Sequence, residues 1–172
     1  MLLQDQPSKL SAADFAGMCR EQLEPALAAA AVEMLGAAPS ASASSPDGAA
    51  APSSRHPFVL AWRDREAQLR NAVAAERARR RGDSAKPRQV GTVGCDPSIA
   101  QGVAAAFAAK DPLSRELAID AIRWNILEDM QGISPFSEAV VLAYAGKLAL
   151  NARRFAIDPD KGMGRFRELT AR

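Results

Sequence analysis

The last third of the chain, residues 112–169, is divided by proline and glycine into segments with helical hydrophobic periodicity. Apolar residues recur at spacings of three and four over residues 113–130, which predicts an amphipathic helix that Gly132 ends. A second helix is predicted over 134–157, and a short third one after Pro159. No stretch of the sequence alternates polar and apolar residues for more than a few positions. The pattern therefore predicts an all-α fold.

The helix predicted over 113–130 carries two apolar stripes. One stripe comprises Leu113, Leu117, Ala121, Trp124 and Leu127, and the other comprises Ile119, Ile122, Ile126 and Met130. Two stripes require two packing partners, so we expect this helix to be the most central one. In the next helix we expect the following residues to face inward: Phe136, Val140, Tyr144 and Leu148.

Upstream, helical patterns precede Gly36, and Cys19 lies inside one of them, which predicts a buried thiol. Residues 37–56 are rich in Ala, Ser and Pro and predict a flexible linker. Pro57 opens a long helix that ends at Gly82, and a second linker and a short helix follow. We therefore expect a helical bundle of long antiparallel helices with flexible linkers. Its expected parts are an N-terminal helical segment (1–36), a disordered linker (37–56) and a bundle domain (57–172).

The net charge of +2 conceals an uneven distribution. Residues 55–89 carry ten basic and four acidic side chains, whereas residues 1–54 are acidic. A basic middle segment favours acidic partners. The longest apolar run, residues 26–32, is far shorter than a membrane span, and the first residues do not resemble a secretory signal. We expect a cytoplasmic protein with reduced cysteines.

The sequence offers no arrangement of residues that is typical of a catalytic site. Metal sites need clustered Cys, His and carboxylate side chains, and His56 is the single histidine. It borders the linker, so we expect it to be exposed to solvent. We predict no catalytic residue, no cofactor and no metal site, and we do not expect an enzyme.

Two groups of polar residues are candidates for interaction with a partner. Four arginines lie on the basic helix and could bind acidic groups or phosphate: Arg70, Arg77, Arg80 and Arg81. The alternative is a purely structural role, in which the arginines lie at a solvated helix end and offset the helix dipole. A second group forms one polar line and suits carboxylates: Lys147, Asn151 and Arg154. Its alternative is a solvent-facing helix surface. Arg123 joins the candidates, with Asp120 or Glu116 as its expected pairing partner.

Several segments, in order along the chain, resemble a known family. The matching segments are residues 11–23, 61–82, 111–130 and 139–169, and the strongest motifs are Trp62 to Asn71, Arg123-Trp124 and Tyr144-Ala-x-Lys147. The family is a bacterial one of uncharacterised proteins that occur among V-type ATP synthase genes. It is similar to the C-like central-stalk subunit of V/A-type ATP synthases.

The resemblance implies a non-catalytic helical component or assembly partner of a V-type ATP synthase. Its partners would be subunits of the central stalk or the membrane ring, with the protein peripheral at the inner membrane through that complex. The alternative hypothesis is a basic helical adaptor that binds nucleic acid or another acidic partner. Direct binding of nucleic acid is the less favoured of the two, because no aromatic residues interleave with the arginines as stacking platforms would require.

Overall fold

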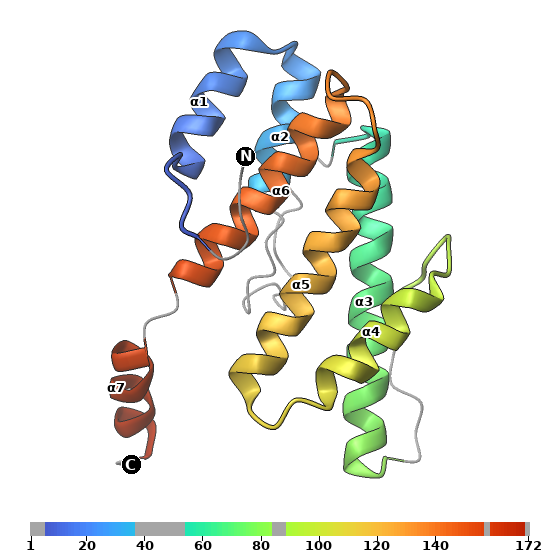
Figure 1. Ribbon diagram of the computed structural model, residues 1–172, viewed down its shortest axis with the longest axis vertical. Helices are drawn as coiled ribbons and strands as arrows, with labels where there is room; N and C mark the ends of the chain where they lie inside the picture. Colours follow the sequence, from blue (N-terminus) through green and yellow to red (C-terminus); the bar gives the residue numbers. More distant parts are fainter. Residues whose placement is uncertain (1–5, 37–53, 84–88, 157–158, 171–172) are drawn as a thin grey trace.

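A computed structural model describes residues 6–36, 54–83, 89–156 and 159–170 of the 172-residue chain. Within these residues there are seven helices and no strand, so the predicted all-α class is confirmed (Figure 1). The helices are α1 (Ala12–Gln22), α2 (Pro25–Gly36), α3 (Pro57–Arg81), α4 (Pro97–Phe107), α5 (Pro112–Gln131), α6 (Glu138–Phe155) and α7 (Pro159–Thr170). Four of them have only 11 or 12 residues, so the expected long helices are α3, α5 and α6.

Local sequence signals account for the helix boundaries. Ser11, Asp96 and Asp111 cap α1, α4 and α5, because each side chain accepts a hydrogen bond from a backbone N–H in the first turn. Gly82 and Gly132 end α3 and α5 with φ angles of 72° and 69°, a region that disfavours residues with a Cβ.

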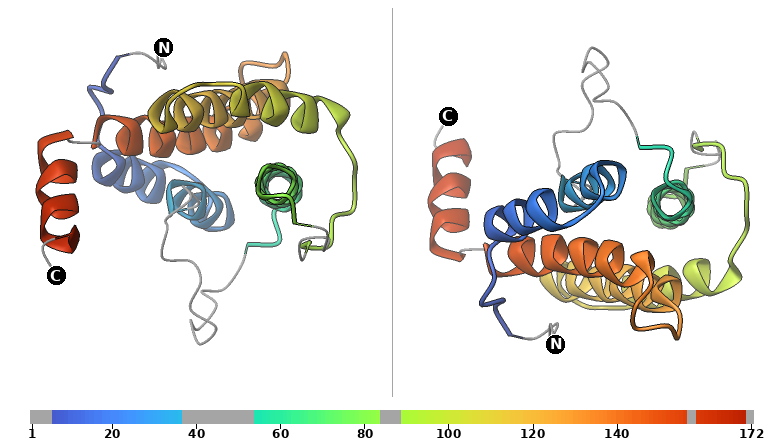
Figure 2. Two further views of the ribbon diagram at one scale, coloured as in Figure 1. Left: turned by 90° about the horizontal axis from the view of Figure 1, so that it is seen from below. Right: turned by 90° about the horizontal axis from the view of Figure 1, so that it is seen from above.

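The helices form two layers, with α1, α2 and α3 on one side and α4, α5 and α6 on the other (Figure 2). Helix α6 packs against α1, α2, α3 and α5, and its residues 145–151 are all buried. The prediction that the helix over 113–130 is the most central is therefore wrong. Gly146 explains the difference, because a Cβ there would lie 3.0 Å from Leu127 Cδ1 and 3.1 Å from Met34 Cε. The missing side chain lets α5 and α2 approach α6 closely.

The N-terminal helices share this core. Helix α2 packs along α6, and Met34 is fully buried in the same hydrophobic cluster as Leu127 and Leu142. Cys19 is buried as predicted, and burial raises the pKa of its thiol despite the charge of Arg20 beside it.

Some predicted inward-facing residues lie outside the core. Phe136 is 97% exposed, because α6 begins at Glu138 and the preceding residues form a turn. Leu113 is 52% exposed in the first turn of α5.

Helix α7 lies at one end of the molecule, away from the two layers (Figure 1), and its Met163 and Leu169 are exposed.

The two predicted linkers have different outcomes. Residues 37–53 of the first one lie outside the described residues, as do residues 84–88 of the second. The remainder of the second linker is held against α3 by hydrogen bonds. Asn71 exchanges two hydrogen bonds with the backbone of Val90, at 2.7 and 2.8 Å, and Asp64 accepts from the N–H groups of Val93 and Gly94. These bonds fix the chain along α3. Asp64 also accepts a hydrogen bond from the Gln68 side chain, and the bonds from Val93, Gln68 and Gly94 hold the pKa of Asp64 below its ordinary value.

Candidate functional site

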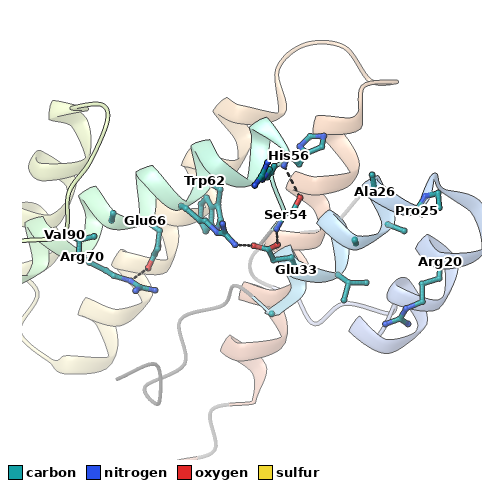
Figure 3. A pocket seen from close by; sticks show the side chains of 17 residues that line it. Arg20, Pro25, Ala26, Glu33, Ser54, His56, Trp62, Glu66, Arg70 and Val90 are labelled. Atoms are coloured by element: carbon teal, nitrogen blue, oxygen red, sulfur yellow. Dashed lines mark hydrogen bonds and ion pairs between the residues drawn. The ribbon is translucent and has the colours of Figure 1, made fainter. Parts of the chain in front are cut away.

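A groove of about 1410 Å³ lies between α2 and α3. Both helices pack against α6, and the groove lies between them (Figure 3). Residues 54–56, which precede α3, line it as well, with Arg20 of α1 and Val90 also contributing. Segments that are far apart in the sequence thus form one site.

The groove walls are built mainly from small and apolar side chains. On α2 the lining residues span the whole helix and comprise Pro25, Ala26, Ala28, Ala29, Val32, Glu33 and Gly36. On α3 they comprise Trp62, Arg63, Glu66, Ala67 and Arg70. Trp62 is the largest side chain of the lining, but it is only 3% exposed, so most of its ring is covered by the core. Small residues on two facing helices leave space in which the backbone of a bound segment can approach.

The rim of the groove is rich in arginine. Arg20, Arg55, Arg63 and Arg70 line it, against the carboxylates of Glu33 and Glu66. Arg63 donates to Glu33, whose second oxygen accepts from the Ser54 N–H at 2.7 Å. Arg20 and Arg55 are exposed. Cationic groups therefore outnumber anionic ones around this opening.

His56 lies at one end of the groove and connects two elements. Its Nδ1 accepts a hydrogen bond from the Phe58 N–H at 3.2 Å and so caps α3. Its Nε2 lies 3.2 Å from Glu138 Oε2, at the start of α6. The predicted exposure of His56 is wrong, because the cap and Glu138 hold a ring that is 21% exposed.

Behind the α3 wall is a buried ion network. Arg123 of α5 donates to both oxygens of Glu66, at 3.0 and 3.1 Å, and to Asp120 Oδ1 at 2.8 Å. Arg153 of α6 also donates to Asp120, at 2.9 Å. Burial acts to lower the pKa of Arg123, but Glu66 and Asp120 outweigh it and raise that pKa. The guanidinium therefore stays charged and ties α5 to α3.

The predicted pairing of Arg123 with Asp120 is confirmed, but its surface role is not supported, because Arg123 is 6% exposed. Glu66 was not among the predicted site residues. A signal for it was present in the sequence: the carboxylate stands four residues after Trp62 and three before Leu69, inside an apolar stripe.

The polar line on α6 does not form an exposed edge. Lys147 and Asn151 are 8% and 3% exposed. Lys147 Nζ donates to Gln131 at 3.1 Å and lies 5.5 Å from the centre of the Trp124 ring. The Asn151 amide accepts from the Ser8 N–H at 2.9 Å and donates to the Gln6 carbonyl at 2.7 Å.

Lys147 and Asn151 therefore bind other parts of their own chain. For these two residues, the prediction of a docking edge and the alternative of a solvent-facing surface are both wrong. Arg154, the third member of the line, is half-buried near the end of α6, beside Phe155.

The arginines at the end of α3 have acidic or carbonyl partners within the chain. Arg79 donates twice to Glu76, at 2.8 and 2.6 Å, and Arg81 donates to Asp83 at 2.9 Å. Arg80 donates to the Phe107 carbonyl at the end of α4 and lies 5.3 Å from the Phe107 ring centre. Bonds from Arg79 and Arg80 lower the pKa of Glu76 to about 2. Among the predicted arginines, Arg70 alone lines the groove, and Arg77 is exposed elsewhere on α3.

Among the described residues, no three His, Cys, Asp or Glu side chains lie close enough to hold a metal ion. None of the helices in that part of the chain is long and apolar enough to cross a membrane.

Residues 98–172 match a family whose description is "Protein of unknown function (DUF2764)". No curated protein and no solved structure matches the chain. The matched residues run from α4 through α7 and include the Arg123 end of the ion network, whereas both groove walls precede them. The description names no activity and no link to V-type ATP synthases. The C-terminal part of the chain is thus similar to an uncharacterised family, and the groove lies in the part that the match does not reach.

Proposed function

We propose that this protein is a non-catalytic docking protein, and that its partners are subunits of a V-type ATP synthase. The observation that carries the docking role is the groove between α2 and α3, whose small apolar lining and arginine-rich rim suit a protein segment. The choice of partner rests on the ordered resemblance of residues 11–23, 61–82, 111–130 and 139–169 to the family that occurs among V-type ATP synthase genes.

This proposal places the protein in the cytoplasm, peripheral to the inner membrane through its complex. It acts as a stalk component or as an assembly partner, and it needs no cofactor. The second hypothesis, a nucleic-acid adaptor, draws less support. Arg79 and Arg81 have carboxylate partners within the chain, and Arg80 is bound to the end of α4. Such pairing reduces the charge available to phosphate groups.

Affinity capture from native membranes under gentle detergent extraction tests the proposal. The tagged full-length chain should co-purify stalk or membrane-ring subunits in fixed proportion, whereas an unrelated tagged helical protein should not. A protein wholly free of ATP synthase subunits would contradict the proposal. Nucleic acid in the eluate, bound with an affinity that falls steeply with salt, would favour the alternative.

A further inference from the structure

The groove between α2 and α3 has enough volume for a third helix. A helix of about 10 Å diameter and 1.5 Å rise per residue fills 1410 Å³ with roughly 12 residues, or three turns. That length is close to the extent of the α2 wall, whose lining runs from Pro25 to Gly36. The small residues Ala26, Ala29 and Ala67 permit close approach of a helix backbone.

The charge of the rim specifies which kind of helix fits. Both oxygens of Glu66 are bound by the buried Arg123, so the exposed Arg70 beside it, 3.3 Å from Glu66 Oε1, faces a carboxylate that already has a partner. Arg20 and Arg55 add two exposed cations at the opening. Because Glu33 is satisfied by Arg63, the net charge presented to a ligand is positive.

From this geometry we infer that the groove binds an amphipathic helix of another protein, with an apolar face directed at Ala26, Ala29 and Val32 and acidic side chains directed at the arginines. This inference rests on the proposed docking function and names the chemistry of its partner. Helix-in-groove binding uses apolar anchors at positions i, i+3, i+4 and i+7, and the complementary charges set orientation and the rate of encounter.

Segments of the chain itself fit this description less well. Helix α7 carries Lys161, Arg165 and Arg167 against Asp160 and Glu168, so its charge is of the wrong sign for the rim. Residues 37–53 contain a single charged residue, Asp47, and three prolines, which is not an amphipathic helical pattern. The rim therefore favours an acidic helix from outside.

Trp62 lines the groove but is only 3% exposed, so it supplies a readout of binding through changes in its surroundings. In a Trp124→Phe background it is the single tryptophan, since the chain contains two. The probe is a 14-residue helical peptide with a leucine stripe and glutamates on its other face (about four turns, slightly longer than the groove), compared with the same peptide bearing lysines. We expect the acidic peptide to change Trp62 emission saturably and to bind at least tenfold more tightly than the basic one. That preference should shrink as salt is added.

Ala29→Glu introduces a carboxylate into the groove and should weaken binding of the acidic peptide at least tenfold. Ala104→Glu, at an exposed position of α4, is the matched control and should leave the affinity unchanged. Circular dichroism establishes that each variant is folded.

Equal affinity for the two peptides, or no binding by folded protein, would overturn the inference. So would binding that appears only after residues 37–53 are replaced by a Gly/Ser linker of equal length, because the chain itself would then be the occupant. A dimer that Ala29→Glu dissociates would instead make a second copy the occupant and would equally overturn it. Capture of ATP synthase subunits by a protein that ignores the acidic peptide would leave the proposed function standing and remove this inference alone.

Discussion

Removal of the Arg123 guanidinium should be among the most destabilising single changes in this protein. Its side chain is 8% exposed, and the two carboxylates that it binds, Glu66 and Asp120, are each 7% exposed. Arg123→Met retains the bulk of the side chain but leaves both carboxylates without their main partner. Loss of one partner from a buried ion pair costs about 3–5 kcal/mol.

The lower end of that range applies here, because each carboxylate keeps a second arginine. Arg70 lies 3.3 Å from Glu66, and Arg153 lies 2.9 Å from Asp120. We therefore expect a loss of about 3 kcal/mol in the free energy of unfolding, or roughly 6–12 °C in Tm for a chain of this size. Urea denaturation followed by circular dichroism measures it.

Two control variants separate this buried network from ordinary surface charge. Arg81→Met breaks the exposed pair with Asp83 and should cost no more than about 1 kcal/mol. The triple variant Glu66→Gln, Asp120→Asn, Arg123→Met removes the buried charges together and should recover much of the loss. If Arg123→Met costs no more than Arg81→Met, the reasoning from burial is refuted.

Three further predictions concern packing, capping and titration. Gly146→Val should lower the free energy of unfolding, measured by urea denaturation, by about 1–3 kcal/mol, because the added carbons would clash with Leu127. Unchanged stability would show that the core rearranges to accommodate them. His56→Ala should cost about 1 kcal/mol through the lost cap of α3, while His56→Asn retains a capping side chain and should cost less. The Glu76 carboxylate should titrate near pH 2 by NMR rather than at its ordinary 4.5, and Arg79→Gln should raise that midpoint. Because this pKa is depressed on folding, the stabilisation is present above the ordinary value and disappears as the pH falls toward 2; a midpoint near 4.5 would contradict the Arg79 contact.

The helices could be predicted because their signals are local. Pro57 and Gly82 bound α3, and Asp111 and Gly132 flank α5, as the sequence pattern indicated. Prolines set the backbone for a first turn and glycines accept positive φ, so these signals depend on few distant residues. The start of α6 was misplaced, because a Ser-Pro pair is equally compatible with the turn that holds Phe136 in solvent.

The candidate site could not be predicted in the same way. The groove depends on the distance at which α2 and α3 pack against α6, which no local pattern encodes. Asn151 is hydrogen-bonded to Gln6 and Ser8, which are more than 140 positions away in the sequence. A local pattern therefore could not show that Asn151 is buried. Periodicity placed Asn151 on a polar line correctly, but it could not show that the chain's own N-terminal segment covers that line.

Site-specific photo-crosslinking tests most directly whether this protein works by docking through the groove. A benzophenone amino acid replaces Ala29 in the groove, and in a matched strain it replaces Ala104 on the exposed surface of α4. Irradiated cells should yield one dominant adduct from position 29, mapped by mass spectrometry to an acidic helical segment of a V-type ATP synthase subunit, and none from position 104. Identical adducts from both positions, or no adduct from position 29, would contradict the account.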